Sequence, residues 1–174
     1  MRYIALLRGI NVGGHKKVAM SDLLALVERL GLDDARTLLQ SGNLVFRTTG
    51  KTAAQLERLL ESEVLKRLAL ETKFFVRSEA EWKAVVAGNP FQSEAKSDPA
   101  RLIVMFLERP AEAENVKALQ DAIQGRETFR AGDRHLYMVY PDGMGTSKLT
   151  NAVIERKLGM RATARNWNTV LKLA

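Results

Sequence analysis

Cysteine does not occur in this chain of 174 residues. Disulfide bonds, thiolate nucleophiles and cysteine-bound metals are therefore excluded. Histidine is almost as scarce, because His15 and His135 are the only two, and neither belongs to a spacing typical of metal ligands. The G-x-S-x-G sequence of a serine nucleophile elbow is also missing. The sequence thus contains none of these catalytic or metal-binding motifs, and we expect no metal and no cofactor.

Long hydrophobic runs are missing as well. The apolar run near the start, residues 4–7, is four residues long and is closed by Arg8. A signal peptide needs an apolar region of at least about seven residues, and a membrane-spanning helix needs about twenty. The sequence therefore predicts a cytoplasmic protein that does not enter a membrane.

Positively charged residues outnumber negatively charged ones. The chain carries 27 lysines and arginines against 20 acidic residues, a net charge of +7, with 46% hydrophobic residues. The excess lies at the two ends of the chain, within residues 1–50 and 125–174. A basic surface favours polyanions or phosphorylated small molecules as partners. The alternative is that the charge only keeps a small globular protein in solution.

Hydrophobic periodicity and turn residues predict a β-α-β-β-α-β order in the first half. Ser21 is the expected N-cap of the first helix and Gly31 its C-terminal stop. The turn Ser41-Gly42-Asn43 has the composition of a hairpin connection. The expected strands are residues 2–7, 35–40, 44–49 and 72–77, and the second helix is residues 52–70. This order predicts an α+β, ferredoxin-like unit.

The same order of elements follows in the second half. A short helix, residues 79–87, precedes the sequence GNPFQSEAKSDP, which is expected to be a linker. The expected elements after it are strands at 101–108, 128–131, 135–140 and 161–165, and helices at 112–124 and 147–158. We therefore predict a ferredoxin-like domain at 1–78, a helix and linker at 79–99, and a second α+β domain at 100–174. The second domain is interpreted as a topological repeat of the first, without residue-level identity.

The sequence LLRGINVGGHKK, residues 6–17, has the glycines and lysines of an anion-binding loop. It does not match the phosphate-loop pattern G-x-x-x-x-G-K-[ST], because His15 and Lys16 follow Gly14. Glycine is also needed wherever a turn adopts a positive φ. The spacing alone therefore leaves open whether the segment binds a ligand or is only a turn.

Fold geometry relates this loop to the hairpin turn. In a ferredoxin-like unit the C-terminal end of the first strand, the turn between the second and third strands, and the start of the fourth strand near Lys73 share one edge of the sheet. Basic, amide and glycine residues then form one rim that contains no carboxylate. The residues predicted to bind a ligand there are Arg8, Asn11, Gly13, Gly14, Lys16, Lys17, Gln40, Ser41 and Asn43.

Two further segments are candidates for the same chemistry. The loop PDGMGTSK, residues 141–148, is expected to enter a helix directly, with Thr146 or Ser147 as its cap and Lys148 in the first turn. Backbone N–H groups at a helix start favour anions, although an ordinary hairpin exit would look the same. In the C-terminal segment, Arg165 and Trp167 could stack on a base or sugar. The alternative for Trp167 is that it docks the last helix onto the core.

The motifs RGINVGG, QSGN and RNWNT, in this order, resemble a bacterial family known only as a domain of unknown function, DUF1697. The resemblance implies a ferredoxin-like α+β fold, and it implies no activity. It also suggests that polar loop residues belong to the family's signature. These are Arg8, Gly9, Asn11, Gly13, Gly14, Gln40, Ser41, Gly42, Asn43 and residues 165–169.

The sequence therefore favours a protein that binds an anionic ligand, either a phosphorylated metabolite, a nucleotide or nucleic acid, at the rim of residues 8–17 and 40–43. One alternative is an enzyme that acts on a phosphorylated substrate by electrostatic stabilisation through Arg8, Lys16 or Lys148. Another is a polyanion-interaction module without a pocket. An RNA-recognition domain is disfavoured, because the strand NLVFRTT lacks the expected aromatic and glycine pattern.

Overall fold

The computed structural model describes residues 1–9 and 17–174. The chain forms two compact units. The first comprises Met1–Lys83 with Leu173, and the second comprises Ala84–Lys172 with Ala174.

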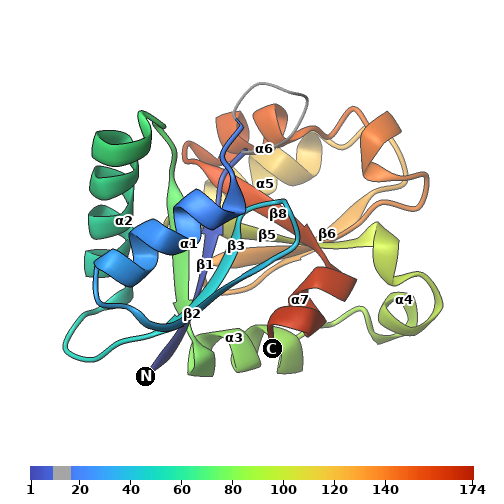
Figure 1. Ribbon diagram of the computed structural model, residues 1–174. Coiled ribbons are helices and arrows are strands. Elements are labelled where there is room, and N and C mark those ends of the chain that lie inside the picture. Colours follow the sequence, from blue (N-terminus) through green and yellow to red (C-terminus); the bar gives the residue numbers. More distant parts are fainter. Residues whose placement is uncertain (10–16) are drawn as a thin grey trace. The chain divides into compact units, whose positions relative to one another are not determined.

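The first unit has the β-α-β-β-α-β order that the sequence predicts (Figure 1). Its elements are β1 (Arg2–Leu7), α1 (Met20–Arg29), β2 (Asp33–Leu38), β3 (Asn43–Arg47), α2 (Ala53–Leu68) and β4 (Phe74–Ser78), and α3 (Glu79–Ala87) follows. The four strands form an antiparallel sheet in the order β2-β3-β1-β4. This is the ferredoxin-like arrangement, with the first and third strands in the centre.

One face of this sheet packs against the apolar faces of α1 and α2. Strand side chains alternate between the two faces, and Tyr3, Ala5 and Leu7 of β1 enter the core shared with the helices. The predicted helical spacing is confirmed in α2, where Leu56, Leu60 and Val64 are all fully buried. Burial of each such side chain contributes about 1.5–3 kcal/mol, so the two helices are held mainly by this face.

The ends of α1 confirm one sequence prediction and correct another. Gly31 has φ +69°, its N–H donates to the Glu28 carbonyl, and the Leu32 N–H donates to the Val27 carbonyl. These are the two hydrogen bonds of a glycine-terminated helix end. The predicted cap at Ser21 is wrong, because the helix begins at Met20 and its N-cap, Ala19, makes no side-chain hydrogen bond. Met20 is buried, so core packing extends the helix beyond the residue that capping preference selects.

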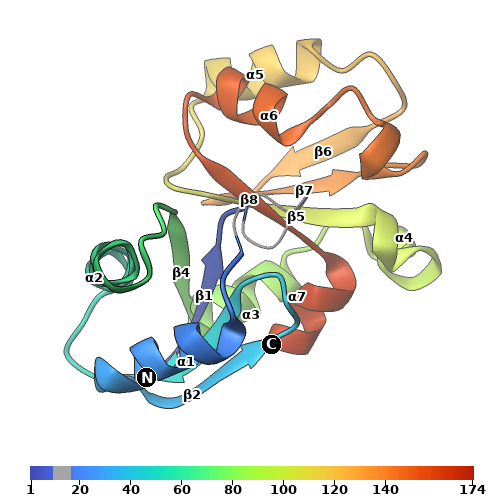
Figure 2. The same ribbon diagram turned by 45° about the horizontal axis from the view of Figure 1, so that its top comes forward.

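The second unit repeats the order of strands, as its antiparallel sheet has the order β6-β7-β5-β8. Figure 2 shows α5 and α6 side by side over one face of this sheet, where Leu119, Ile154 and Leu158 enter the core. Its elements are α4 (Gln92–Ser97), η1 (Pro99–Arg101), β5 (Leu102–Leu107), α5 (Ala113–Asp121), β6 (Thr128–Ala131), β7 (His135–Val139), η2 (Met144–Thr146), α6 (Asn151–Leu158), β8 (Ala162–Asn166) and α7 (Trp167–Leu173). The α+β class with two similar halves is thus confirmed.

The segment expected to be a linker contains α4 and the 3₁₀ turn η1. The helix predicted at 147–158 starts at the wrong residue. The loop at 141–148 does not enter a helix directly, because α6 begins at Asn151 and its cap is the Thr150 side chain, which accepts a hydrogen bond from the Val153 N–H. Lys148 therefore lies outside the helix.

Candidate functional site

Three segments meet at one edge of the first sheet, as the fold geometry predicts. The Leu7 N–H donates to the Gly42 carbonyl over 2.9 Å, which ties the end of β1 to the β2–β3 turn. On the other side of β1, the Arg8 N–H donates to the Lys73 carbonyl over 3.0 Å. The Thr72 hydroxyl donates to the Arg8 carbonyl over 2.9 Å. Arg8 is therefore fixed through its backbone between the turn and the start of β4.

The β2–β3 turn is held together by Asn43. This side chain is fully buried, and its amide nitrogen donates to the Leu38 carbonyl over 2.8 Å and to the Ser41 hydroxyl over 3.0 Å. Of the predicted turn residues, Gln40 is exposed and Ser41 is partly exposed. The arrangement makes Asn43 the residue that shapes the turn, whereas Gln40 and Ser41 present polar groups at its surface.

Three residues at this edge have positive φ. Gly42 has φ +77° and Gly9 has φ +64°, and both conformations favour glycine. Leu39 is also left-handed at φ +62°, and 49% of its surface is exposed. A leucine in this conformation is strained, and such residues cluster at functional sites. The left-handed Leu39 is therefore a conformational outlier at the tip of the turn.

Two basic residues predicted at the rim are among the described residues. Lys17 is exposed and Arg8 is partly exposed. Lys73, at the start of β4, lies 3.5 Å from the Glu61 carboxylate of α2, so one acidic group approaches the rim from the helix. The predicted ligand residues Asn11, Gly13, Gly14 and Lys16 lie outside the described residues.

The second candidate loop borders a cavity of about 280 Å³ that contains acidic groups. The Ser147 hydroxyl donates to Glu127 over 2.5 Å and accepts from the Leu149 N–H over 3.0 Å. Asp142 pairs with Arg126, and this hydrogen bond lowers the pKa of the Asp142 carboxyl. Lys148 is exposed beside these groups. Two carboxylates at the cavity oppose the binding of an anion there.

Arg165 and Trp167 are buried, with 8% and 5% of their surfaces exposed. The Arg165 guanidinium donates to the Thr163 hydroxyl over 2.9 Å and to the Ala164 carbonyl over 2.8 Å. Burial lowers the pKa of Arg165 to about 10. Trp167 is the first residue of α7, which Asn166 caps. In this arrangement neither side chain presents a stacking surface to solvent.

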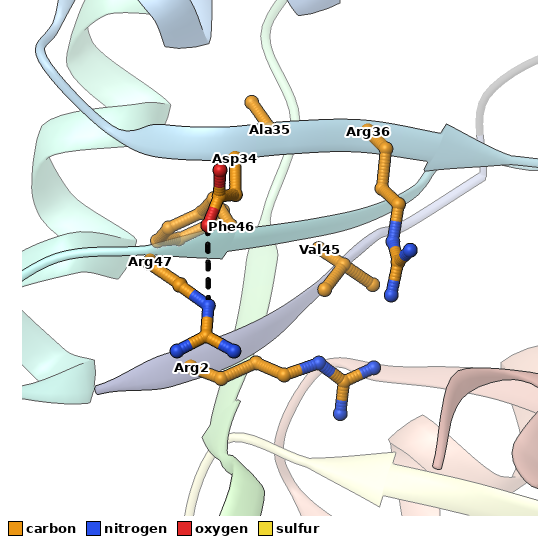
Figure 3. Close-up of a pocket in the computed structure, with 7 residues that line it drawn as sticks. All are labelled: Arg2, Asp34, Ala35, Arg36, Val45, Phe46 and Arg47. Carbon is orange, nitrogen blue, oxygen red and sulfur yellow. Dashed lines mark ion pairs between the residues drawn. The ribbon is translucent and has the colours of Figure 1, made fainter.

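One basic pocket was missed by sequence reasoning (Figure 3). It has a volume of about 400 Å³, and its charged lining residues are Arg2 of β1, Arg36 of β2, Arg47 of β3 and Asp34. Arg2 and Arg47 lie at strand ends and Arg36 lies within β2. Arg2 is an even-numbered residue of a strand whose odd-numbered residues enter the helix-covered core. That alternation was the signal that could have predicted the pocket. It is interrupted in β2 by a β-bulge, because the register shifts between Asp33 and Arg36.

Two consecutive units with the β-α-β-β-α-β order define a tandem ferredoxin-like α+β protein. The family model described as "Protein of unknown function (DUF1697)" matches residues 1–137. The chain belongs to this family. The match includes the RGINVGG and QSGN motifs and ends before RNWNT.

Comparison with solved structures supports the fold. The chain is similar to the conserved bacterial protein SP0830 from Streptococcus pneumoniae, with a TM-score of 0.78, 24% identity, and coverage of 99% of this chain and 96% of that chain. No curated protein matches the sequence. Within residues 1–9 and 17–174, no helix has the length and apolar character needed to cross a membrane. Nor do three histidine or acidic side chains gather as metal ligands in that part of the chain.

Proposed function

We propose that this protein binds an anionic ligand at the edge of the first sheet, between Arg8 and the turn at residues 40–43. The ligand class is a phosphorylated metabolite, a nucleotide or nucleic acid, and we infer a cytoplasmic location. One observation carries the proposal. Arg8 is hydrogen-bonded to the start of β4, and the adjoining end of β1, at Leu7, is hydrogen-bonded to the turn. Three segments distant in the sequence are thereby joined at the backbone of Leu7 and Arg8.

The chemistry of these groups favours an anion. A guanidinium offers five N–H donors in a planar fork that matches phosphate and carboxylate oxygens. Arg8 is anchored by its own backbone N–H and carbonyl, so a ligand does not have to order the main chain at this position. The exposed Gln40 and Lys17 supply a neutral donor and a second cation from the neighbouring segments.

Thermal-shift screening against nucleotides, sugar phosphates and short oligonucleotides tests the proposal. A ligand at a hundred times its Kd stabilises the folded state by about 2.7 kcal/mol, which raises the Tm by several degrees. We expect Arg8→Ala to abolish this shift. The fold should survive, because both Arg8 hydrogen bonds named above are made by its backbone.

Arg58→Ala is the matched control. Arg58 lies on the exposed side of α2 in the same unit, so its removal changes the net charge equally. The ligand-induced shift should persist in this variant. If no compound in the screen shifts the Tm, or if both variants respond like the wild-type protein, the proposal is wrong.

Turnover separates binding from catalysis. An enzyme that stabilises developing negative charge would convert a phosphorylated substrate and lose this activity on substitution of Arg8. A simple binding protein shows the thermal shift with no product. Assay of the same compounds for released phosphate therefore decides between the two functions at one site.

A further inference from the structure

The arginine-lined pocket lies on the face of the first sheet that α1 and α2 do not cover. Figure 3 shows Arg2, Arg36 and Arg47 projecting on the same side of β1, β2 and β3, with Val45 between them. The registers agree with this view, because Arg2 pairs with Arg47 across β1 and β3, and Arg36 pairs with Val45 across β2 and β3. Three guanidinium groups therefore border one cavity of about 400 Å³.

Cationic groups are in excess in this cavity. Residues directly opposite on antiparallel strands have close Cβ atoms, and like charges at such positions are destabilising. Arg2 and Arg47 occupy such a pair. Among the residues that the structure describes, Asp34 is the one carboxylate lining the pocket, and it lies 3.3 Å from the Arg47 Nε.

The three arginines differ in how many of their guanidinium N–H groups already have a partner within the protein. The Arg2 side chain lies 3.7 Å from the Glu79 carboxylate and donates to the Leu173 carbonyl over 2.9 Å. Arg47 is paired through Nε, and its side chain is 60% exposed. Arg36 is exposed, and none of the residues in the described ranges forms an ion pair or side-chain hydrogen bond with it. The outer side of the pocket therefore offers several guanidinium donors to a ligand.

A β-bulge places the acidic residue of the pocket. The register of β2 shifts between Asp33 and Arg36, and Asp34 has φ +49°. A bulge inserts one extra residue and redirects the side chains next to it. Here it brings the Asp34 carboxylate beside Arg47 while Arg36 stays on the face that Val45 occupies. Asp34 thereby pairs with the Arg47 guanidinium and does not neutralise the charge of Arg36.

We propose that this pocket is a second anion site, which takes the phosphate group of a small phosphate monoester, held by the forks of Arg36 and Arg47. Ligand pockets commonly have volumes of about 300–1,000 Å³, so a cavity of about 400 Å³ accommodates a phosphate with a few carbon atoms attached. The site is distinct from the Arg8 edge, because Arg47 pairs with Arg2 at the start of β1, and Arg36 pairs with Val45, which faces Ile4. These positions lie three to five strand residues from Leu7, or about 10–17 Å.

Nuclear magnetic resonance of the arginine Nε–H groups tests this site directly. The ¹⁵N-labelled full chain is titrated with glycerol phosphate, and with sodium chloride at equal ionic strength. We expect the Arg36 and Arg47 resonances to shift with glycerol phosphate and not with chloride. Absence of that difference overturns the proposal, whatever happens at Arg8.

Variants locate the binding. Arg36→Gln should weaken the affinity for glycerol phosphate at least about tenfold, because it removes charge-assisted hydrogen bonds. Arg36→Lys keeps the charge but not the planar fork, and should give an intermediate affinity. Arg58→Gln is the control of equal charge change and should leave the affinity unchanged. Equal losses in Arg36→Gln and Arg58→Gln would overturn the proposal.

The two proposed sites can fail separately. Arg8→Gln should leave the response of Arg36 and Arg47 to glycerol phosphate unchanged, because Arg8 lies at the other end of β1. A loss of that response in Arg8→Gln would mean that one ligand site includes both ends of the strand, and would contradict the separate site inferred here.

Discussion

At the scale of the single residue, Asn43 shows how a predicted ligand residue can have a structural role. Its amide nitrogen makes two hydrogen bonds inside the β2–β3 turn, to the Leu38 carbonyl and the Ser41 hydroxyl, and the side chain is fully buried. An asparagine that crosslinks a turn and an asparagine that binds a phosphate look the same in a sequence. Only the placement of Leu38 and Ser41 around it distinguishes the two roles.

We expect Asn43→Ala to lower the free energy of unfolding by about 2 kcal/mol, because two hydrogen bonds are lost and the partly buried Leu38 carbonyl loses a donor. Gln40→Ala, at an exposed position of the same turn, should change it by less than about 0.5 kcal/mol. Urea denaturation of the two variants beside the wild-type protein measures both values. Equal stabilities would show that the turn does not depend on the Asn43 side chain.

At the scale of the element, α6 shows why capping rules locate a helix start only to within a few residues. The sequence offered Thr146 or Ser147 as the cap of this helix, with Lys148 in its first turn. The structure uses Thr150, while the Ser147 hydroxyl bonds to Glu127 and the Leu149 N–H. A hydroxyl that has a better partner elsewhere is not available as a cap, and that partner is distant in the sequence.

Thr150→Ala should destabilise the protein by about 1 kcal/mol, the usual cost of removing an N-cap. Thr150→Ser keeps the hydroxyl and should remain close to the wild-type protein. Thermal unfolding monitored by circular dichroism compares the two. Were Thr146→Ala to lower the Tm while Thr150→Ala did not, the helix would start where the sequence pattern had indicated.

At the scale of the whole molecule, the sequence predicted the order of strands well and the sites only in part. Apolar periodicity, Gly31 and the Ser41-Gly42-Asn43 turn were sufficient for the first unit, since these signals are local. The joining of Arg8 to the turn edge followed from the topology alone. The pocket of Arg2, Arg36 and Arg47 did not, because its arginines come from three strands, and the register of β2 against β3 depends on a bulge at Asp34.

The net charge of +7 is also a property of the whole molecule, and it yields a prediction on how the protein binds nucleic acid. The salt dependence of affinity for a single strand has a slope of about −0.7 for each phosphate neutralised. A site that neutralises two phosphates therefore loses about sevenfold in affinity for the oligonucleotide between 50 and 200 mM salt. A diffuse surface that neutralises six phosphates loses more than about a hundredfold. Fluorescence anisotropy with a labelled oligonucleotide measures the slope.

We expect any oligonucleotide binding to have the shallow slope and to weaken much more in Arg8→Ala than in Arg58→Ala. The reason is that a defined site depends on the position of a guanidinium, whereas a diffuse surface depends on the total charge, which both variants lower equally. A steep slope with equal losses in the two variants would assign the binding to the overall charge of the molecule. The Arg8 edge would then have no part in it.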